Sequence, residues 1–173
     1  DIGVKGVWND MNEPAVMEVP NKTFPMDVRH DYDGNPCSHR KAHNIYGTQM
    51  ARATYHGVKR FAYPKRPFVI TRSAYAGAQR YTSSWTGDNV ATWEHLWIAN
   101  IQVQRMSISG MGFTGSDIGG FAEQPSGELY ARWIQLGVFH PFCRTHSSGD
   151  HGNQEPWAFD EEVIDITRKF VNL

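Results

Sequence analysis

The strongest constraint on the fold is an alternation of short apolar runs with longer segments of helical periodicity. A short apolar run between turn signals is typical of a strand buried on both faces. A helical segment between two such runs is typical of a crossover that returns the chain parallel to the first strand. The pattern therefore predicts an α/β fold in which βα units build a parallel sheet.

The positions of these elements follow from the same pattern. The expected strands cover residues 3–8, 67–71, 83–85, 112–116 and 139–143, and the expected helices cover residues 40–60, 93–108, 128–137 and 160–170. Residues 15–38 are rich in proline and polar side chains, so we expect a long loop there instead of a second domain. Trp93 and Trp97 lie one helical turn apart, and we expect them to form a core stripe of their helix.

Chain length limits how much of a barrel these units can form. A closed (β/α)8 barrel takes about 250 residues, whereas this chain has 173 and supplies four or five βα units. We therefore expect one partial, open TIM-barrel domain over residues 1–173. The sequence does not begin with Met and soon enters its first expected strand, so we interpret the chain as a fragment.

Composition excludes some classes of partner. The formal net charge is -1, from 17 basic and 18 acidic residues, and no basic run is long enough to neutralise a string of phosphates. No apolar stretch approaches the roughly 20 residues that span a bilayer. We expect neither nucleic acid nor membrane as a partner. Cys37 and Cys143 are expected to be independent, partly buried thiols.

Polar side chains gather just after the expected strands, which is the catalytic face of a parallel barrel. They are Asp10, Arg72, Asp88, Asp117 and His146, and aromatic residues Trp8, Trp85 and Phe121 accompany them. Carboxylates and arginine bind sugar hydroxyls, and aromatic rings stack on the apolar faces of sugars. Paired carboxylates in such a pocket favour glycoside hydrolysis, in which one attacks the anomeric carbon and the other transfers the proton.

The motifs that carry these residues resemble those of the family 31 glycoside hydrolases, which include α-glucosidases and α-xylosidases. Trp8-Asn9-Asp10-Met11-Asn12-Glu13-Pro14 resembles the nucleophile motif of that family. The other matching motifs follow in order: His39-Arg40, His43-Asn44, Tyr46-Gly47, Thr71-Arg72-Ser73, Trp85-Thr86-Gly87-Asp88-Asn89, Gly115-Ser116-Asp117-Ile118-Gly119-Gly120-Phe121 and Pro141-Phe142-Cys143-Arg144-Thr145-His146. The resemblance covers essentially the whole chain and implies the C-terminal half of a TIM barrel.

The resemblance also implies roles for individual residues. Asp10 would be the nucleophile and Asp88 the acid/base of a retaining α-glycosidase, without metal or organic cofactor. The sugar would be bound by Trp8, Met11, Arg72, Trp85, Asp117, Phe121 and His146. We expect Asp10, Arg72, Asp88 and Asp117 at one edge of a parallel sheet, with the Asp10 and Asp88 carboxyl groups about 5 to 6.5 Å apart.

Simpler roles remain open for several of these residues. Asp10, Asp88 and Asp117 could be cap or turn carboxylates, Arg72 could pair with a neighbouring acid, and His146 could be a loop histidine. Glu13 is an alternative nucleophile, and Asp117 is an alternative acid/base. His39 and His43 have metal-ligand spacing but are interpreted as residues of a helix start. Residues 31–35 faintly resemble a calcium loop and are interpreted as a turn.

The expected activity is hydrolysis of a terminal α-linked glucose in an oligosaccharide or α-glucoside. The alternatives are an α-xylosidase or α-transglucosylase of the same family, or a relative that binds sugar without turnover. The missing half of the barrel is the expected structural partner, and we expect the chain alone to be inactive.

Overall fold

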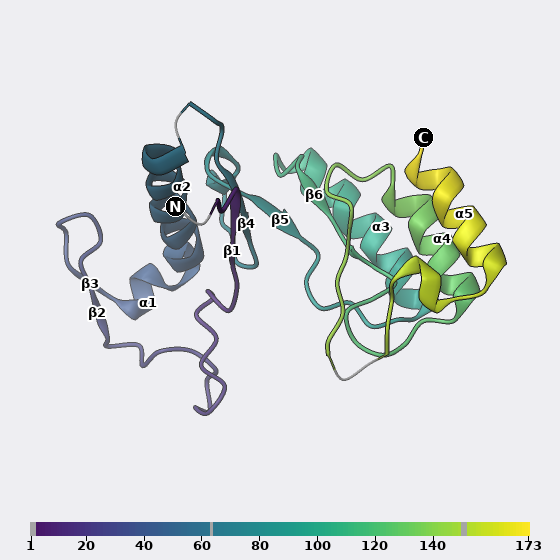
Figure 1. The fold of residues 1–173 in the computed structure, drawn as a ribbon. Helices are drawn as coiled ribbons and strands as arrows, with labels where there is room; N and C mark the ends of the chain where they lie inside the picture. The colour runs from purple at the N-terminus through teal and green to yellow at the C-terminus, as the bar shows by residue number, and fades with distance from the viewer. Residues whose placement is uncertain (1–2, 63, 150–151) are drawn as a thin grey trace. The chain divides into compact units, whose positions relative to one another are not determined.

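The computed structural model describes residues 3–62, 64–149 and 152–173 (Figure 1). These residues form two compact units, one reaching from the N-terminus to Ser84 and the other from Trp85 to Leu173. The boundary falls within strand β5 (Ser83–Trp85).

A parallel sheet forms the centre of the first unit. Strand β1 (Gly6–Asn9) pairs with β4 (Phe68–Thr71), and β4 pairs with β5, both in parallel. Asn9 lies opposite Thr71, so the residues that follow β1 and β4 emerge at the same end. The predicted parallel strands are confirmed. The first begins at Gly6, later than the expected start at Gly3, whose φ of +74° is not an extended conformation.

Helical segments follow the long loop of the first unit. They are α1 (His39–Ala42), the 3₁₀ turn η1 (His43–Ile45) and α2 (Tyr46–Ala62). A single helix over residues 40–60 was expected, and a 3₁₀ turn interrupts it. Helix α2 packs on β1 and β4 (Figure 1). Gly47 permits this packing, since a Cβ there would lie 2.6 Å from the Ser73 carbonyl oxygen.

The loop over residues 15–38 contains a small hairpin. Strand β2 (Arg29–His30) pairs antiparallel with β3 (Cys37–Ser38). Between them the chain turns, and the Asp31 carboxylate accepts a hydrogen bond from the Gly34 amide at 2.9 Å. Asp33 forms an ion pair with Arg52 at 2.7 Å. The prediction of a turn at residues 31–35 is confirmed.

Three capped helices organise the second unit. They are α3 (Trp93–Ile108), α4 (Gly127–Gly137) and α5 (Glu161–Val171), and their bounds differ from the predicted ones by at most one residue. Thr92, Ser126 and Asp160 each accept a hydrogen bond from the backbone amide three residues later, which is the N-cap interaction that fixes a helix start.

The strands of the second unit differ from the prediction. The run at residues 112–116 forms the shorter strand β6 (Thr114–Gly115), and a separate strand β7 (Asp117–Ile118) follows it and pairs in parallel with β8 (Arg144–Thr145). The strand expected at residues 139–143 is wrong. The amides of Val138, Phe139 and His140 bond to carbonyls of α4, so these residues form the turn that ends the helix, and the strand starts later.

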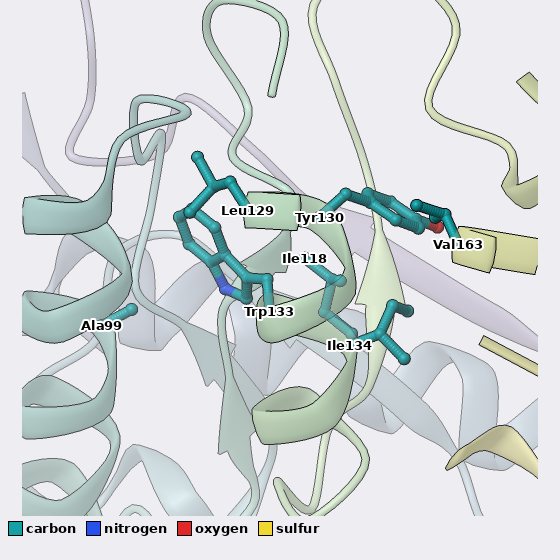
Figure 2. Close-up of a cluster of buried hydrophobic side chains, with 7 residues drawn as sticks. All are labelled: Ala99, Ile118, Leu129, Tyr130, Trp133, Ile134 and Val163. Atoms are coloured by element: carbon teal, nitrogen blue, oxygen red, sulfur yellow. The ribbon is translucent and has the colours of Figure 1, made fainter. Parts of the chain in front are cut away.

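The core of the second unit lies between its helices and β7. Its buried side chains, drawn in Figure 2, are Ala99, Ile118, Leu129, Tyr130, Trp133, Ile134 and Val163. Trp133 is fully buried, and its indole N–H donates to the Ser116 hydroxyl at 3.0 Å. Tyr130 stacks on Phe159 with 4.5 Å between ring centroids.

The predicted tryptophan stripe of α3 is wrong. Trp93 is 52% exposed and Trp97 is 66% exposed. The inward face of α3 instead carries Ala99 and Val103, and Leu96 packs against the core. These three positions follow the helical period of a face adjacent to the tryptophans.

The two cysteines are free thiols. Both were expected to be partly buried, whereas Cys37 is buried and Cys143 is exposed. Over the ranges that the structure describes, no helix combines the length and the apolar character needed to cross a membrane.

The buried Trp133 gives a test of this core. Trp133→Ala is expected to lower the free energy of unfolding by about 3–5 kcal/mol, because a large cavity opens and the Ser116 hydroxyl loses its donor. Trp157, which is 76% exposed, is the matched control. Its replacement by Ala is expected to cost less than about 0.5 kcal/mol in denaturant titrations followed by circular dichroism. Equal losses for the two variants would contradict the assigned core.

Candidate functional site

A turn after β1 carries the first group of candidate residues. Met11 has a φ of +57°, a left-handed conformation that non-glycine residues seldom adopt. Asn12, 1% exposed, holds this turn in place: its amide donates to the Thr71 hydroxyl at 2.8 Å and accepts from the Ser73 backbone N–H at 3.1 Å. The turn is thereby attached to the residues that follow β4.

Arg72 joins the carboxylates of this turn. Its Nε lies 2.9 Å from one Glu13 oxygen and a terminal nitrogen lies 3.0 Å from the other, which is a bidentate ion pair. The same Nε lies 3.4 Å from Asp10 Oδ1, and the terminal nitrogen lies 2.7 Å from the Met11 sulfur. The Asp10 side chain remains 37% exposed. Arg72 therefore pairs with neighbouring acids and also lies at the candidate nucleophile.

Trp8 lies in β1, two residues before Asp10. Strand β1 ends at Asn9, so Asp10 is the first residue after it. Trp8 is 39% exposed, which leaves ring surface available for contact with a ligand. The structure thus brings Asp10, Met11 and Arg72 together, with Trp8 on the strand that leads to them.

A buried ion pair organises the candidate residues of the second unit. Asp117 is fully buried, and its Oδ1 accepts from Arg144 Nε at 3.2 Å and from a terminal nitrogen at 2.5 Å. The Arg144 guanidinium also lies over the Trp85 ring, at 5.3 Å, and near the Phe142 ring, at 5.2 Å. Arginine thus connects the buried carboxylate to two aromatic side chains.

The environment of Asp117 changes its protonation. Burial raises the pKa of Asp117 to about 6, Arg144 opposes this rise, the negative charge of Asp88 adds to it, and the Trp85 side chain lowers it. A carboxyl group whose pKa is higher in the folded than in the unfolded chain binds its proton more tightly in the fold. The folded state therefore loses stability as the pH rises from about 4 to about 6, because the unfolded chain releases this proton at a lower pH than the folded chain does.

Asp88 lies in an exposed turn of the second unit. It follows Gly87, whose φ is +83°, and precedes Asn89, which is buried. The Asn89 carbonyl accepts the amides of Phe121 at 2.6 Å and Ala122 at 3.1 Å. These bonds attach the loop that carries Asp88 to the loop that carries Phe121.

Phe121 and His146 lie against each other. Their ring centroids are 5.2 Å apart, and the Ser148 amide donates to the Phe121 carbonyl at 2.8 Å. In the second unit the structure thus connects all five predicted site residues through contacts, charge or shared loops: Trp85, Asp88, Asp117, Phe121 and His146.

Sequence reasoning missed four supporting residues. They are Asn12, Glu13 in its role as partner of Arg72, Asn89 and Arg144. Arg144 had the same signal as the predicted residues, since it lies in the last strand beside the motif histidine. The others lie within the matched motifs, but their partners are distant in sequence. Over the described part of the chain, no group of three or more His, Cys, Asp or Glu side chains is arranged to hold a metal ion.

Comparison with known proteins identifies the family to which the chain belongs. A family model described as the glycosyl hydrolases family 31 TIM-barrel domain matches residues 1–173. Alpha-glucosidase 2 of Bacillus thermoamyloliquefaciens is 47% identical over 175 residues, covering 100% of this chain and 22% of that protein. Glucosidase 2 subunit alpha of Saccharomyces cerevisiae is 46% identical over 169 residues, covering 96% of this chain and 17% of that protein.

Solved structures show the same likeness. The crystal structure of an ER glucosidase II heterodimer, formed by a catalytic subunit and the binding domain of a regulatory subunit, matches with a TM-score of 0.88 and 40% identity. This match covers 95% of this chain and 18% of that one. The family 31 alpha-glucosidase from Bacteroides thetaiotaomicron matches with a TM-score of 0.86 and 40% identity, over 98% of this chain and 26% of that one.

The Asp117–Arg144 pair gives a test of the site electrostatics. Arg144→Met is expected to raise the pKa of Asp117 above about 6, because the charge that favours the ionised carboxylate is lost. A carbon-13 NMR titration of the aspartate carboxyl groups measures it. Arg132→Met removes an exposed guanidinium that bonds within α4 and is expected to leave the Asp117 titration unchanged. An unchanged or lower pKa in Arg144→Met would show that the pair does not control Asp117.

Proposed function

Because the chain belongs to glycosyl hydrolase family 31, we propose that it forms the catalytic part of a retaining α-glucosidase. The reaction is hydrolysis of a terminal α-linked glucose by double displacement through a glycosyl-aspartate ester. The chain spans 22% and 17% of the length of the two curated relatives above, so the activity is proposed for the polypeptide that carries it. Residues 1–173 form one partial barrel domain in this proposal, and the remaining barrel strands complete the site.

Asp10 is the proposed nucleophile, and its looser contact with Arg72 is the observation that carries the proposal, since the side chains of Asp10 and Glu13 are about equally exposed, at 37% and 38%. Glu13 gives both carboxylate oxygens to Arg72, so attack by Glu13 would require a bidentate ion pair to break. Asp10 makes only the longer 3.4 Å contact to that guanidinium. The difference favours Asp10 over Glu13, since a nucleophile needs an oxygen free to reach the anomeric carbon.

Asp88 is the proposed acid/base. A group that protonates a leaving oxygen and then deprotonates water must reach both, and Asp88 lies in an exposed turn. Asp117 has a raised pKa but is fully buried and bonded to Arg144, which makes it the weaker candidate. A separation of about 5 to 6.5 Å between the Asp10 and Asp88 carboxyl groups stays a prediction.

The remaining site residues bind the sugar in this proposal. Aromatic rings stack on its apolar face, while charged and polar side chains bond its hydroxyls. These residues are Trp8, Met11, Arg72, Trp85, Asp117, Phe121 and His146. Neither a metal nor an organic cofactor is required by two carboxylates acting in turn. The presence of both Asp10 and Asp88 favours turnover over sugar binding alone, and the 173-residue chain without its partner strands is expected to be inactive.

Variants of the two carboxylates test their roles in the full-length polypeptide. With Asp88→Ala, a glucosyl fluoride still forms the ester because its leaving group needs no proton; added azide then releases the α-azide. With Asp10→Ala, azide attacks the substrate directly from the opposite face and gives the β-azide. NMR of the products identifies the anomer. Opposite products would reverse the roles, and wild-type behaviour of Asp88→Ala would exclude it as the acid/base.

A variant of Glu13 tests whether it positions Arg72. Glu13→Gln keeps the side-chain shape but removes the charge of the bidentate pair, so kcat is expected to fall roughly 10- to 100-fold through misplacement of Arg72 and Asp10. A fluorinated glucosyl fluoride that traps the ester should still label Asp10, as peptide mass spectrometry shows. Labelling of Glu13 in the wild-type protein would instead identify Glu13 as the nucleophile.

A further inference from the structure

Three histidine rings form a hydrogen-bonded chain in the first unit, apart from the candidate site. His39 is the central ring and is fully buried. Its Nδ1 lies 2.9 Å from His30 Nε2, and its Nε2 lies 3.0 Å from His43 Nδ1. The Thr23 hydroxyl lies 2.9 Å from His39 Nε2 and 3.3 Å from His43 Nδ1.

This chain attaches the long loop to the helix start. His30 and Thr23 belong to the loop over residues 15–38, whereas His39 and His43 belong to α1 and η1. The same loop begins at the candidate catalytic turn, where the Ala15 amide donates to the Met11 carbonyl at 2.9 Å. The loop is also held by the backbone bonds of His39 to Val28 and of Arg40 to Met26 and by the Asp33–Arg52 ion pair, so the histidine contacts contribute to the docking of a segment that starts beside Asp10.

Aromatic side chains and a cavity surround these rings. Phe24 and Tyr46 pack against His39. A cavity of about 580 Å³ lies beside His30, and its titratable or charged lining residues are Asp31, Tyr32, Asp33, Tyr46, Arg52 and His56. Charged residues nearby in the sequence, on the loop and on α1, are Asp27, Arg29, Arg40 and Lys41, all exposed. Among the described residues, no carboxylate forms a hydrogen bond or ion pair with His30, His39 or His43.

Counting hydrogens limits the charge of the chain. Each nitrogen-to-nitrogen contact needs one hydrogen, so the two contacts hold two hydrogens. The outer nitrogens, His30 Nδ1 and His43 Nε2, hold at most one each. Neutral rings carry one hydrogen apiece, so the intact chain accepts a single positive charge. The Thr23 hydroxyl adds a donor and an acceptor. It does not remove the repulsion between two N–H groups that point at each other across a nitrogen-to-nitrogen contact.

Opening of the loop raises this limit. His39 and His43 lie four residues apart in consecutive helical segments, so their contact persists, and that pair still accepts one charge. The released His30 accepts another. We propose that the loop over residues 15–38 is docked by a histidine chain that holds one positive charge, and that each opening takes up one further proton.

The burial of His39 also favours proton uptake by the open state over the docked state. Burial, and then the charges of His43 and His30, lower the pKa of His39, so the central ring resists protonation in the docked state. Histidine ordinarily titrates near pH 6.5, so the docked loop is most stable above that pH. Below it, the opening constant rises about tenfold per pH unit, because one more proton is bound in the open state.

Hydrogen exchange of the full-length polypeptide tests the proposal, which does not depend on the proposed function. Peptides covering residues 15–38 are followed by mass spectrometry from about pH 7.5 to pH 5, above the range in which ordinary carboxylates titrate. Rates are corrected for intrinsic exchange. The wild-type opening constant is expected to rise about tenfold per pH unit below pH 6.5.

Two glutamine variants predict opposite results. In His30→Gln the docked and open states both accept one charge, so the opening constant is expected to lose its pH dependence. In His43→Gln the docked state accepts one charge and the open state two, so the tenfold slope is expected to remain. Peptides from α4 (Gly127–Gly137) serve as the reference and are expected to be unchanged in both variants.

The pH dependence of the opening constant tests the proposal even where a variant weakens docking at all pH values. A flat wild-type profile, or a slope of about a hundredfold or more per pH unit, would overturn the limit of one charge. A slope retained in His30→Gln, or lost in His43→Gln, would overturn the assignment of the released proton site to His30. If His30→Gln leaves the loop unprotected even at pH 7.5, the wild-type and His43→Gln slopes still give this answer.

Discussion

The ion pair of Arg72 with Glu13 is the interaction on which the first group of site residues depends. Arg72 follows β4, which pairs with strands on both sides, and it binds both oxygens of Glu13 while it also lies near Asp10. A turn that carries two carboxylates and a left-handed Met11 would repel itself without such a cation. Arg72 therefore lets two acids lie close together while only one of them is occupied by a bidentate bond.

In the second unit an arginine likewise stabilises a carboxylate, and here the carboxylate is buried. Asp117 lies out of contact with water, so its charge depends on Arg144, and Arg144 in turn lies over Trp85. Removing one partner of such a pair leaves an uncompensated buried group, which is more costly than losing an exposed ion pair. The result is a rigid connection between a carboxylate and an aromatic wall, next to the exposed turn that presents Asp88.

Much of the fold and most of the candidate site residues could be predicted, because they depend on local patterns. Helix α3 has the predicted bounds, since Thr92 is an N-cap and the apolar spacing is helical. The exposed Trp93 and Trp97 could not be placed, because helical spacing identifies two adjacent faces and only packing selects between them. The turn at residues 139–143 was mistaken for a strand because its apolar composition hides the backbone bonds to α4.

The four acids differ in what already binds them, and this separates their proposed roles better than sequence position does. Glu13 is bonded to Arg72 through both carboxylate oxygens and Asp117 to Arg144 through Oδ1, so these oxygens are committed to structure. Asp10 keeps a longer contact with Arg72, with a side chain as exposed as that of Glu13, and Asp88 lies in an exposed turn. Attack on carbon and transfer of a proton both require an oxygen that can approach a ligand. The short arginine contacts of Glu13 and Asp117 thus favour supporting roles, whereas the longer contact of Asp10 and the exposed turn of Asp88 favour these two acids for chemistry.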